Sequence, residues 1–398
     1  MLNAYIYDGL RSPFGRHAGA LSSIRPDDLL AEVIRALVSR NGFDPASIED
    51  VIAGCTNQAG EDARNVARHA ALLAGLPVEV AGLTVNRLCG SGLAAIADAA
   101  RAVSCGEGEL FVAGGTESMS RAPFVISKGE TAFSRNAQIF DTTMGARFPN
   151  KKITKQYGAD TMPETADNIA KDLGISREDS DRFAAASQAK YEAARAAGFF
   201  KEEIQPIQIA GRKGTTTIEV DEHPRPETTL DKLATLGTLF EGGVVTAGNA
   251  SGINDGAGAL LIGSLQAGEK AGVKPRGRIL STAVAGVPPR VMGLGPVPAS
   301  RKALARAGLS LKDMDVIEIN EAFATQVLGC LKQLEISFDD SRVNPNGGAI
   351  AVGHPLGASG ARIALTALRQ LERTGGRYAL VSMCIGVGQG IAAVIERV

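Results

Sequence analysis

The spacing of apolar residues along the chain predicts alternating helices and strands. Residues 26–42 read PDDLLAEVIRALVSRNG, with acidic residues first, apolar residues three or four positions apart and an Asn-Gly stop. This pattern is typical of an amphipathic helix, and similar spacing predicts helices over 300–309 and 358–376. Short apolar runs of strand length occur at 4–9, 51–55, 377–383 and 391–398. The alternation predicts an α/β fold with parallel or mixed sheets covered by helices.

This order of elements occurs twice. Each copy has an apolar strand, a Val-Asn turn rich in glycine, a helix of small residues and a second apolar strand. The matched positions keep a nearly constant separation: Val51 with Val316, Val85 with Val343, Gly92 with Gly360, and Val112 with Val381. The period is too long for a solenoid. The repeat therefore predicts two duplicated βαβ-type halves, packed face to face as α-β-α-β-α layers.

A charged, irregular segment interrupts the first half. It contains a polar helical stretch at 176–198 and the proline-rich DEHPRPETT at 221–229. Such an excursion from a rigid scaffold often carries binding residues. The predicted domains are an N-terminal half (1–120 plus 244–270), an inserted loop domain (121–243), and a C-terminal half (271–398).

Composition narrows the function classes. The 398 residues include 47 glycines and carry a net charge of −1, so no basic excess attracts nucleic acid or an anionic membrane. The five cysteines show no CxxC or Cys/His spacing, which argues against a disulfide framework and a structural metal site. The N-terminus has no signal pattern, and no uninterrupted apolar run approaches 18 residues. A cytoplasmic protein without metal, nucleic-acid or membrane partners is expected.

Four glycine-rich turns carry the candidate chemistry. Cys89 lies in NRLCGSG, just before a predicted helix whose dipole favours thiolate. Asn320 lies in INEAFA, His354 in VGHPLG and Cys384 in MCIG. Each residue taken alone also has a structural interpretation, as a buried hydrophobe or a satisfied turn. The GVGQG stretch at 386–390 lacks the spacing and the following helix of a dinucleotide loop.

Together the turns supply two thiols, one imidazole and one amide. This set suits acyl transfer joined to the making or breaking of a carbon–carbon bond. One thiolate would carry the acyl group, the second thiol would move a proton at carbon, and N–H donors would hold the oxyanions.

The whole chain resembles the thiolase family. The motifs that carry the resemblance are VNRLCGSG, GGTESMS, VVTAGNASGINDGA, NEAFA, NPNGGAIAVGHPLGASGAR and CIGVGQG, in the family order. EDARNVARHAALLAGLP, QYGADTMPETADNIA and GVGQG are most similar to 3-oxoadipyl-CoA thiolases of aromatic-compound degradation. The resemblance implies an acyltransferase that cleaves a 3-oxoacyl-CoA, here 3-oxoadipyl-CoA to succinyl-CoA and acetyl-CoA, by a ping-pong mechanism.

The resemblance also implies the roles of the site residues. Cys89 matches the acylated nucleophile, and His354 matches the group that activates it and helps to bind the thioester carbonyl. Cys384 matches the second acid/base thiol. Asn320 matches the residue that positions a water in the first oxyanion hole, and the N–H groups of Cys89 and Gly386 match the second hole.

Coenzyme A is expected as a substrate, with no permanently bound cofactor. By resemblance, Ser251, Ala247 and Met162 match contacts to its pantetheine arm, Arg225 matches a basic residue near the nucleotide, and Phe323 matches a wall of the pocket. Thr161 stands where short-chain biosynthetic thiolases carry a histidine, which favours a longer, polar acyl chain. The resemblance further implies a homo-oligomer, a tetramer built as a dimer of dimers, with the 120–160 stretch resembling the tetramer loop.

Three alternatives stay open at this stage. The first is a short-chain acetyl-CoA C-acetyltransferase that acts on acetoacetyl-CoA. The second is a condensing enzyme of fatty-acid synthesis, against which Cys384 and Asn320 argue because such enzymes lack the second cysteine. The third is a non-catalytic acyl-CoA or lipid carrier on the same fold, which would not need the reactive groups.

Overall fold

The strands of the two halves pair in the same way. The structure, a computed structural model, describes residues 1–211 and 214–398. The strands of the first half are β1 (Ala4–Arg11), β3 (Asp50–Gly54), β4 (Ala81–Val85), β5 (Leu110–Ser118) and β10 (Asn254–Gly263). Those of the second half are β11 (Gly277–Gly286), β12 (Val316–Ile319), β13 (Tyr378–Ile385) and β14 (Gln389–Arg397). β3 runs parallel to β5, and β5 runs antiparallel to β10; β12, β13 and β14 repeat this arrangement.

The predicted duplication is therefore confirmed. The two copies differ at one edge, where the first half has the complete strand β4 and the second half has only a parallel bridge between Val343 and Ile317. In addition, β1 pairs with β11 through Ala4–Ile6 and Gly277–Ile279. Within the described ranges, hydrogen bonds thus join the strands of both halves in the order β12-β13-β14-β11-β1-β10-β5-β3-β4, and the short β2 (Gly15–Arg16) pairs with β10.

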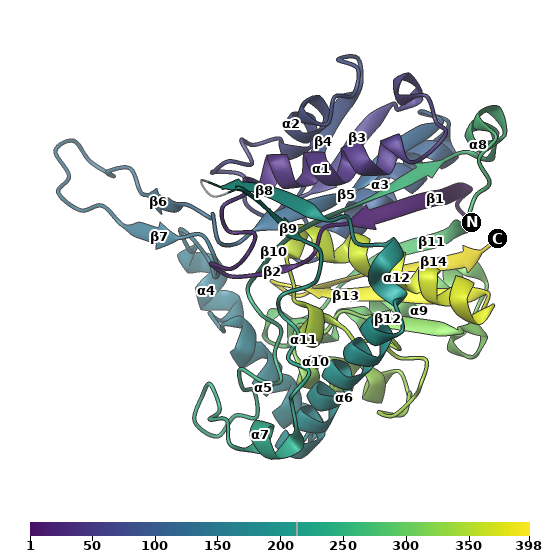
Figure 1. Cartoon of the computed structure of the whole chain (residues 1–398). Helices are drawn as coiled ribbons and strands as arrows, with labels where there is room; N and C mark the ends of the chain where they lie inside the picture. The colour runs from purple at the N-terminus through teal and green to yellow at the C-terminus, as the bar shows by residue number, and fades with distance from the viewer. Residues whose placement is uncertain (212–213) are drawn as a thin grey trace.

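Helices form three layers around these strands (Figure 1). α3 (Ser91–Cys105) and α12 (Leu356–Thr374) lie in the middle and share one apolar core with strands of both halves. α1 (Pro26–Ser39) and α2 (Val66–Leu73) cover the other face of the first half. α9 (Pro296–Ala307) and α10 (Ala324–Gln333) cover the second half. This is the expected α-β-α-β-α order.

The helix predictions differ from the structure mainly at the ends. The helix expected over 300–309 begins at Pro296, because prolines 296 and 298 are tolerated in a first turn, where their missing N–H is not needed. α3 is the one described helix that is long and apolar enough to cross a membrane, with a mean hydropathy of 1.2 over Leu88–Cys105, and 67% of that stretch is buried in the protein. Its apolar character reflects its place between the two halves.

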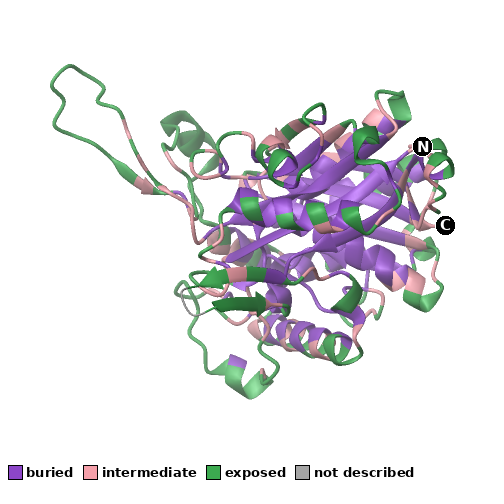
Figure 2. Ribbon diagram, turned by 45° about the horizontal axis from the view of Figure 1, so that its top comes forward, coloured by how far each residue is buried: buried purple, intermediate pink, exposed green. Residues whose placement is uncertain are grey.

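The segment between the halves contributes peripheral elements. They are β6 (Phe124–Ile126), β7 (Ile139–Asp141), α4 (Lys151–Tyr157), α5 (Met162–Leu173), α6 (Arg177–Ala196), β8 (Ile207–Gly211), β9 (Gly214–Ile218) and α7 (Leu230–Ala234). β6 and β7 form an arm that extends away from the body (Figure 1), and Figure 2 shows this arm as mostly exposed and the central strands as buried. α5 and α6 pack against α10. The remaining short helices are α8 (Leu265–Ala271), α11 (Ala349–Val352) and the 3₁₀ turns η1 (Pro45–Ser47), η2 (Phe199–Glu202), η3 (Pro289–Leu294) and η4 (Leu311–Asp313).

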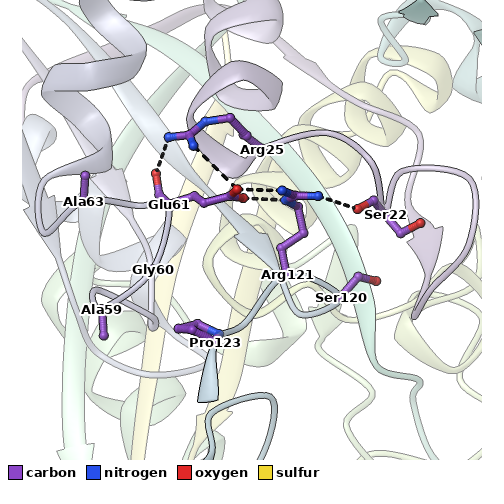
Figure 3. Close-up of a pocket in the computed structure, with 9 residues that line it drawn as sticks. All are labelled: Ser22, Arg25, Ala59, Gly60, Glu61, Ala63, Ser120, Arg121 and Pro123. Atoms are coloured by element: carbon purple, nitrogen blue, oxygen red, sulfur yellow. Dashed lines mark hydrogen bonds and ion pairs between the residues drawn. The ribbon is translucent and has the colours of Figure 1, made fainter. Parts of the chain in front are cut away.

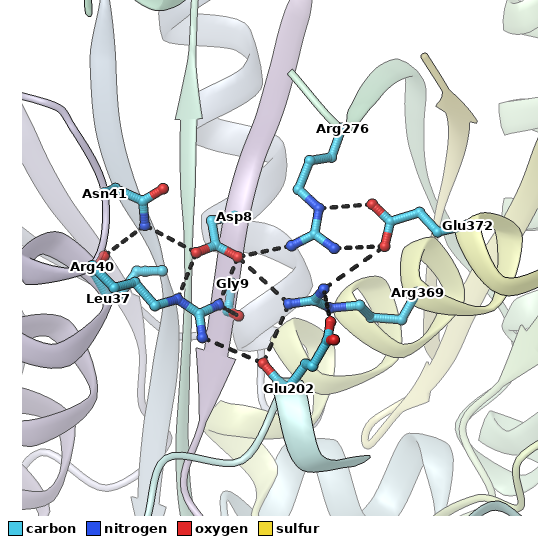
Figure 4. Close-up of polar contacts among 9 residues, drawn as sticks. All are labelled: Asp8, Gly9, Leu37, Arg40, Asn41, Glu202, Arg276, Arg369 and Glu372. Atoms are coloured by element: carbon cyan, nitrogen blue, oxygen red, sulfur yellow. Dashed lines mark hydrogen bonds and ion pairs between the residues drawn. The ribbon is translucent and has the colours of Figure 1, made fainter. Parts of the chain in front are cut away.

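An ionic cluster around the buried Asp8 ties these parts together (Figure 4). The carboxylate of Asp8, on β1, accepts bonds from Arg40 after α1 at 2.6 Å and from Arg276 before β11 at 2.9 Å. Arg369 on α12 lies 3.6 Å from the same carboxylate and also pairs with Glu202 of η2. Because these residues come from both halves and from the inserted segment, the cluster fixes the three parts relative to one another.

Candidate active site

Cys89 lies in a tight turn between β4 and α3. Leu88, just before it, has a φ of 46°, a left-handed conformation that is costly for a residue other than glycine. Gly90 follows, and a Cβ there would lie 2.7 Å from Ile385 Cδ1. The turn is held by the Ser91 hydroxyl, which donates to Leu88 O at 2.6 Å. These contacts place a partly exposed Cys89 at the start of α3.

The environment of the Cys89 thiol differs from the sequence-based expectation. The N–H groups of Gly386 and of Cys89 itself are directed at the sulfur and favour the thiolate, as predicted for a helix N-terminus. Burial has the larger effect, however, and the pKa of Cys89 is raised above its ordinary value. The local N–H groups therefore act in the expected direction but are outweighed by burial, and the nucleophile needs a base.

His354 is a buried, neutral imidazole. Burial, together with the nearby charge of Arg362, lowers its pKa to about 3. Its Nδ1 lies 2.7 Å from the Ser359 hydroxyl, which itself donates to Pro355 O at 2.9 Å. Ser359 can therefore only accept from Nδ1, so the proton is on Nδ1 and Nε2 is unprotonated. Nε2 accepts a bond from Asn320 Nδ2 at 3.3 Å.

Asn320 directly follows β12, and its backbone N–H donates to Ser382 O at 3.0 Å. Its side chain is fully buried, yet its Oδ1 has no hydrogen-bond partner among the described residues. A buried carbonyl oxygen of this kind normally meets a donor, often an ordered water. The arrangement suits the predicted role of Asn320 in positioning a water next to His354.

Cys384 lies on β13, in an apolar cluster that includes Phe323 and Met292. Burial and the proximity of Cys89 raise its pKa well above the ordinary value. Cys384 therefore holds its proton at neutral pH and can deliver it as an acid. The structure thus places the two thiols close enough for each to affect the ionisation of the other.

The residues assigned to CoA differ in how the structure places them relative to the reactive turns. Met162 begins α5, and its Sδ lies 3.7 Å from the position of a Cβ built on Gly386. Ser251 donates from its N–H to Ala322 O at 2.9 Å, which ties its loop to the NEAFA turn and to Phe323. Ala247, on the same segment, is exposed. Arg225 is also exposed, and its backbone N–H donates to Gln188 Oε1 at 2.9 Å.

Sequence reasoning missed several supporting residues. Asn254 accepts a bond from the His354 N–H at 2.9 Å and donates to Gly15 O at 2.9 Å. Ser359 fixes the tautomer of His354. Because Ser359 lies only five residues after His354, the sequence could have indicated this contact. Glu117, in GGTESMS, accepts bonds from several backbone groups near the site. Asn254 and Glu117 have no sequence signal of their own because most of their partners are backbone atoms of distant turns.

A separate polar cavity of about 560 Å³ lies at the base of the arm (Figure 3). Glu61 is clamped by Arg121, with Nη2 2.6 Å from Oε1, and Arg25 lies 3.5 Å from the same carboxylate. None of the residues predicted for the site lines this cavity. Within the two described ranges, no group of three or more His, Cys, Asp or Glu side chains is arranged to hold a metal ion.

Comparisons with known proteins give the family of the chain. The thiolase N-terminal domain model matches residues 4–266, and the thiolase C-terminal domain model matches 273–397. The chain is 59% identical to a 3-oxoadipyl-CoA/3-oxo-5,6-dehydrosuberyl-CoA thiolase of Escherichia coli over the full length of both, and 58% identical to a beta-ketoadipyl-CoA thiolase of Pseudomonas aeruginosa over 99% of both.

Solved structures give the same assignment. Human mitochondrial 3-ketoacyl-CoA thiolase superposes with a TM-score of 0.93 at 42% identity, covering 100% of this chain and 99% of that one. The acetyl-CoA acetyltransferase of Bacillus anthracis also superposes with a TM-score of 0.93, at 39% identity and the same coverage. From its matched domains, its relatives and its fold, this chain belongs to the thiolase family.

Proposed function

We propose that this thiolase cleaves 3-oxoadipyl-CoA with coenzyme A to give succinyl-CoA and acetyl-CoA, through an acyl group on Cys89. The observation that carries the chemistry is the convergence of two backbone N–H groups on the Cys89 sulfur, beside the protonated thiol of Cys384. The choice of substrate rests on relatives that are 59% identical to this chain over its full length and bear the names 3-oxoadipyl-CoA and beta-ketoadipyl-CoA thiolase.

In the first half-reaction, the unprotonated Nε2 of His354 exchanges its bond with Asn320 Nδ2 for the proton of Cys89. The thiolate attacks the 3-keto carbon, and the N–H groups of Cys89 and Gly386 hold the oxygen that becomes negative. The bond between C2 and C3 then breaks, leaving an acyl-Cys89 and the enolate of acetyl-CoA. His354 and a water on Asn320 hold the enolate oxygen, and Cys384 gives its proton to the carbon.

The second half-reaction returns each proton. Coenzyme A enters and passes its thiol proton to the Cys384 thiolate. The CoA thiolate attacks the acyl-Cys89 carbonyl, and the departing Cys89 thiolate recovers its proton from His354. No proton is gained or lost overall, so the site needs no other acid or base. Losing one oxyanion donor in such a scheme costs about 3–4 kcal/mol of transition-state stabilisation.

Two measurements test the proposal. Values of kcat/KM for 3-oxoadipyl-CoA and acetoacetyl-CoA at saturating CoA should favour the former by at least about tenfold, since a site that pairs a polar group discriminates strongly. The reverse preference would identify an acetyl-CoA acetyltransferase, as in the relative from Bacillus anthracis. Mass spectrometry after quenching without CoA should find a succinyl increment on the Cys89 peptide, and its absence would indicate a non-catalytic carrier.

The proposal includes CoA binding by Ser251, Ala247, Met162 and Arg225, with Phe323 as a wall of the acyl pocket. One solved relative, the human mitochondrial 3-ketoacyl-CoA thiolase, is described in complex with CoA. Residues 124–157 carry six basic and two acidic side chains, an excess that would attract the phosphates of CoA. CoA acts here as a substrate, without a permanently bound cofactor.

The proposal also includes a homotetramer in the cytoplasm. The arm exposes apolar side chains, and β4 is an edge strand with the exposed Leu83. Exposed apolar patches and open strand edges are typical of surfaces that another chain covers. All five cysteines are free thiols, which suits a reducing compartment.

A further inference from the structure

Glu117 is a buried carboxylate to which the reaction scheme gives no role. It lies near the end of β5 and is only 2% exposed. Among the residues that the structure describes, no Lys, Arg or His lies within salt-bridge distance of it. A buried carboxylate without a cationic partner is costly unless other donors compensate it.

Four N–H and O–H donors surround the Glu117 carboxylate, and the Cys55 thiol is a fifth donor, 4.0 Å from Oε1. The Thr56 N–H donates to Oε2 at 3.1 Å and the Thr56 hydroxyl to Oε1 at 2.9 Å. The Asn57 N–H donates to Oε1 at 3.2 Å, and the Gly357 N–H donates to Oε2 at 3.0 Å. Because every partner is a donor, the contacts fit the ionised form, which accepts and does not donate. Gly357 lies in the first turn of α12, where the helix dipole also favours a negative charge.

These contacts connect the two reactive turns. Gly357 comes three residues after His354. Thr56 O accepts a bond from Asn86 Nδ2 at 3.1 Å, and Asn86 comes three residues before Cys89. One carboxylate thus links the turn that carries the nucleophile, through the loop after β3, to the turn that carries its base.

We propose that Glu117 is a positioning residue that holds the Cys89 turn and the His354 turn in register for proton transfer between them. This proposal rests on the proposed function of Cys89 and His354 as nucleophile and base. It adds a residue that touches neither the substrate nor the reacting atoms.

The charge of Glu117 has a second effect. It contributes to raising the pKa of Cys89, after burial, whereas the N–H groups of Gly386 and Cys89 lower it. Cys384 is the other ionisable group coupled to Cys89, and it is a neutral thiol at rest. Glu117 therefore adds to the effect of burial in disfavouring the Cys89 thiolate.

Two substitutions separate position from charge. Glu117→Gln removes the charge and replaces one acceptor by an NH₂ group that opposes the N–H donors. Glu117→Asp keeps the charge but shortens the side chain. We expect both to slow single-turnover acylation of Cys89 by about a hundredfold, the effect of a misplacement of about 1 Å, with KM for CoA changed less than about twofold because the CoA residues are untouched.

The pH dependence of Cys89 alkylation by iodoacetamide distinguishes the two variants, and it requires no acyl-CoA. The profile should shift to lower pH in Glu117→Gln and stay at its wild-type position in Glu117→Asp. A loosened fold alone would not produce this difference. The proposal would be overturned if Glu117→Gln acylated Cys89 at the wild-type rate and kept the wild-type alkylation profile. If the wild-type protein itself did not acylate at all, the proposed function would be overturned instead.

Two further variants complete the design. Glu107→Gln, an exposed carboxylate just beyond α3, serves as the matched control and should change neither measurement. Thr56→Val removes only the hydroxyl donor to Oε1 and covers the case in which Glu117→Gln does not fold. It should slow acylation in the same direction, with KM for CoA unchanged, and unaltered acylation would contradict the proposal.

Discussion

At the residue scale, the two cysteines of the site differ in what surrounds each sulfur. Cys89 has two N–H donors and is partly exposed, whereas Cys384 is buried among apolar side chains.

We expect Cys89→Ala to lose acylation and turnover below detection, because no other group can carry the acyl chain. Cys384→Ala should lower kcat by about 10²–10⁴-fold, the contribution of one acid/base group, while the acyl increment on Cys89 remains partly detectable by mass spectrometry. An active Cys89→Ala variant would contradict the mechanism.

His354 links stability to pH. Its pKa is about 3 in the folded protein and about 6.5 in an unfolded chain. Between these values the unfolded chain binds more protons, so stability falls as the pH drops below 6.5. The loss from this histidine alone should reach about 2 kcal/mol by pH 5.

Urea unfolding at pH 7 and pH 5 measures this loss, at one protein concentration because assembly also affects stability. His354→Asn keeps a polar side chain that does not titrate and should lose correspondingly less stability than the wild-type protein between the two pH values. An equal loss in both proteins would show that His354 does not resist protonation in the folded state.

At the element scale, the reactive turns meet because α3 and α12 cross with almost no space between their backbones. A Cβ on Gly92 would lie 2.5 Å from Gly357 O, and a Cβ on Gly360 would lie 2.0 Å from Leu93 N. These two glycines are also the positions that the internal repeat matches. The crossing therefore determines the distance between the Cys89 turn and the His354 turn.

Gly92→Ala should separate the first turns of the two helices. Overpacking of this kind costs about 1–3 kcal/mol of stability, and kcat should fall more than the change in Tm suggests, since both reactive groups move apart. Gly237→Ala is the matched control, because a Cβ there meets no atom within 4 Å. The explanation fails if Gly92→Ala lowers Tm but leaves kcat at the wild-type value.

Much of this element-scale order could be predicted from the sequence, because apolar spacing and the repeat of the Val-Asn turns depend on local pattern. The site residues came from the motifs, and the structure brings Cys89, Cys384, His354 and Asn320 into two neighbouring groups. Three features could not be predicted. The pairing of β1 with β11 depends on the relative placement of the halves, the neutral state of Cys89 depends on burial that outweighs a local dipole, and the contacts of Glu117 are to backbone groups far apart in sequence.

At the scale of the whole molecule, the contacts within a single chain do not explain the exposed apolar side chains of the arm. Its apolar side chains are widely exposed: Phe124 at 70%, Ile126 at 62%, Phe133 fully, and Ile139 at 65%. Its strands β6 and β7 pair only with each other among the described residues, and a lone two-stranded hairpin is at best marginally stable in water. A surface of this kind is stabilised when another copy covers it.

Deletion of the arm tip, residues 127–138, should therefore convert the proposed tetramer to a dimer. The edge strand β4 and the core of both halves are untouched by this change, so the dimer should remain folded with a similar Tm. Multi-angle light scattering gives the mass of each species, and Phe133→Ser tests whether the apolar tip alone is needed. A deletion variant that keeps the tetramer mass would place the contact between dimers elsewhere, whereas a wild-type protein that is already a dimer would leave the exposed arm for a different partner and contradict the proposed assembly.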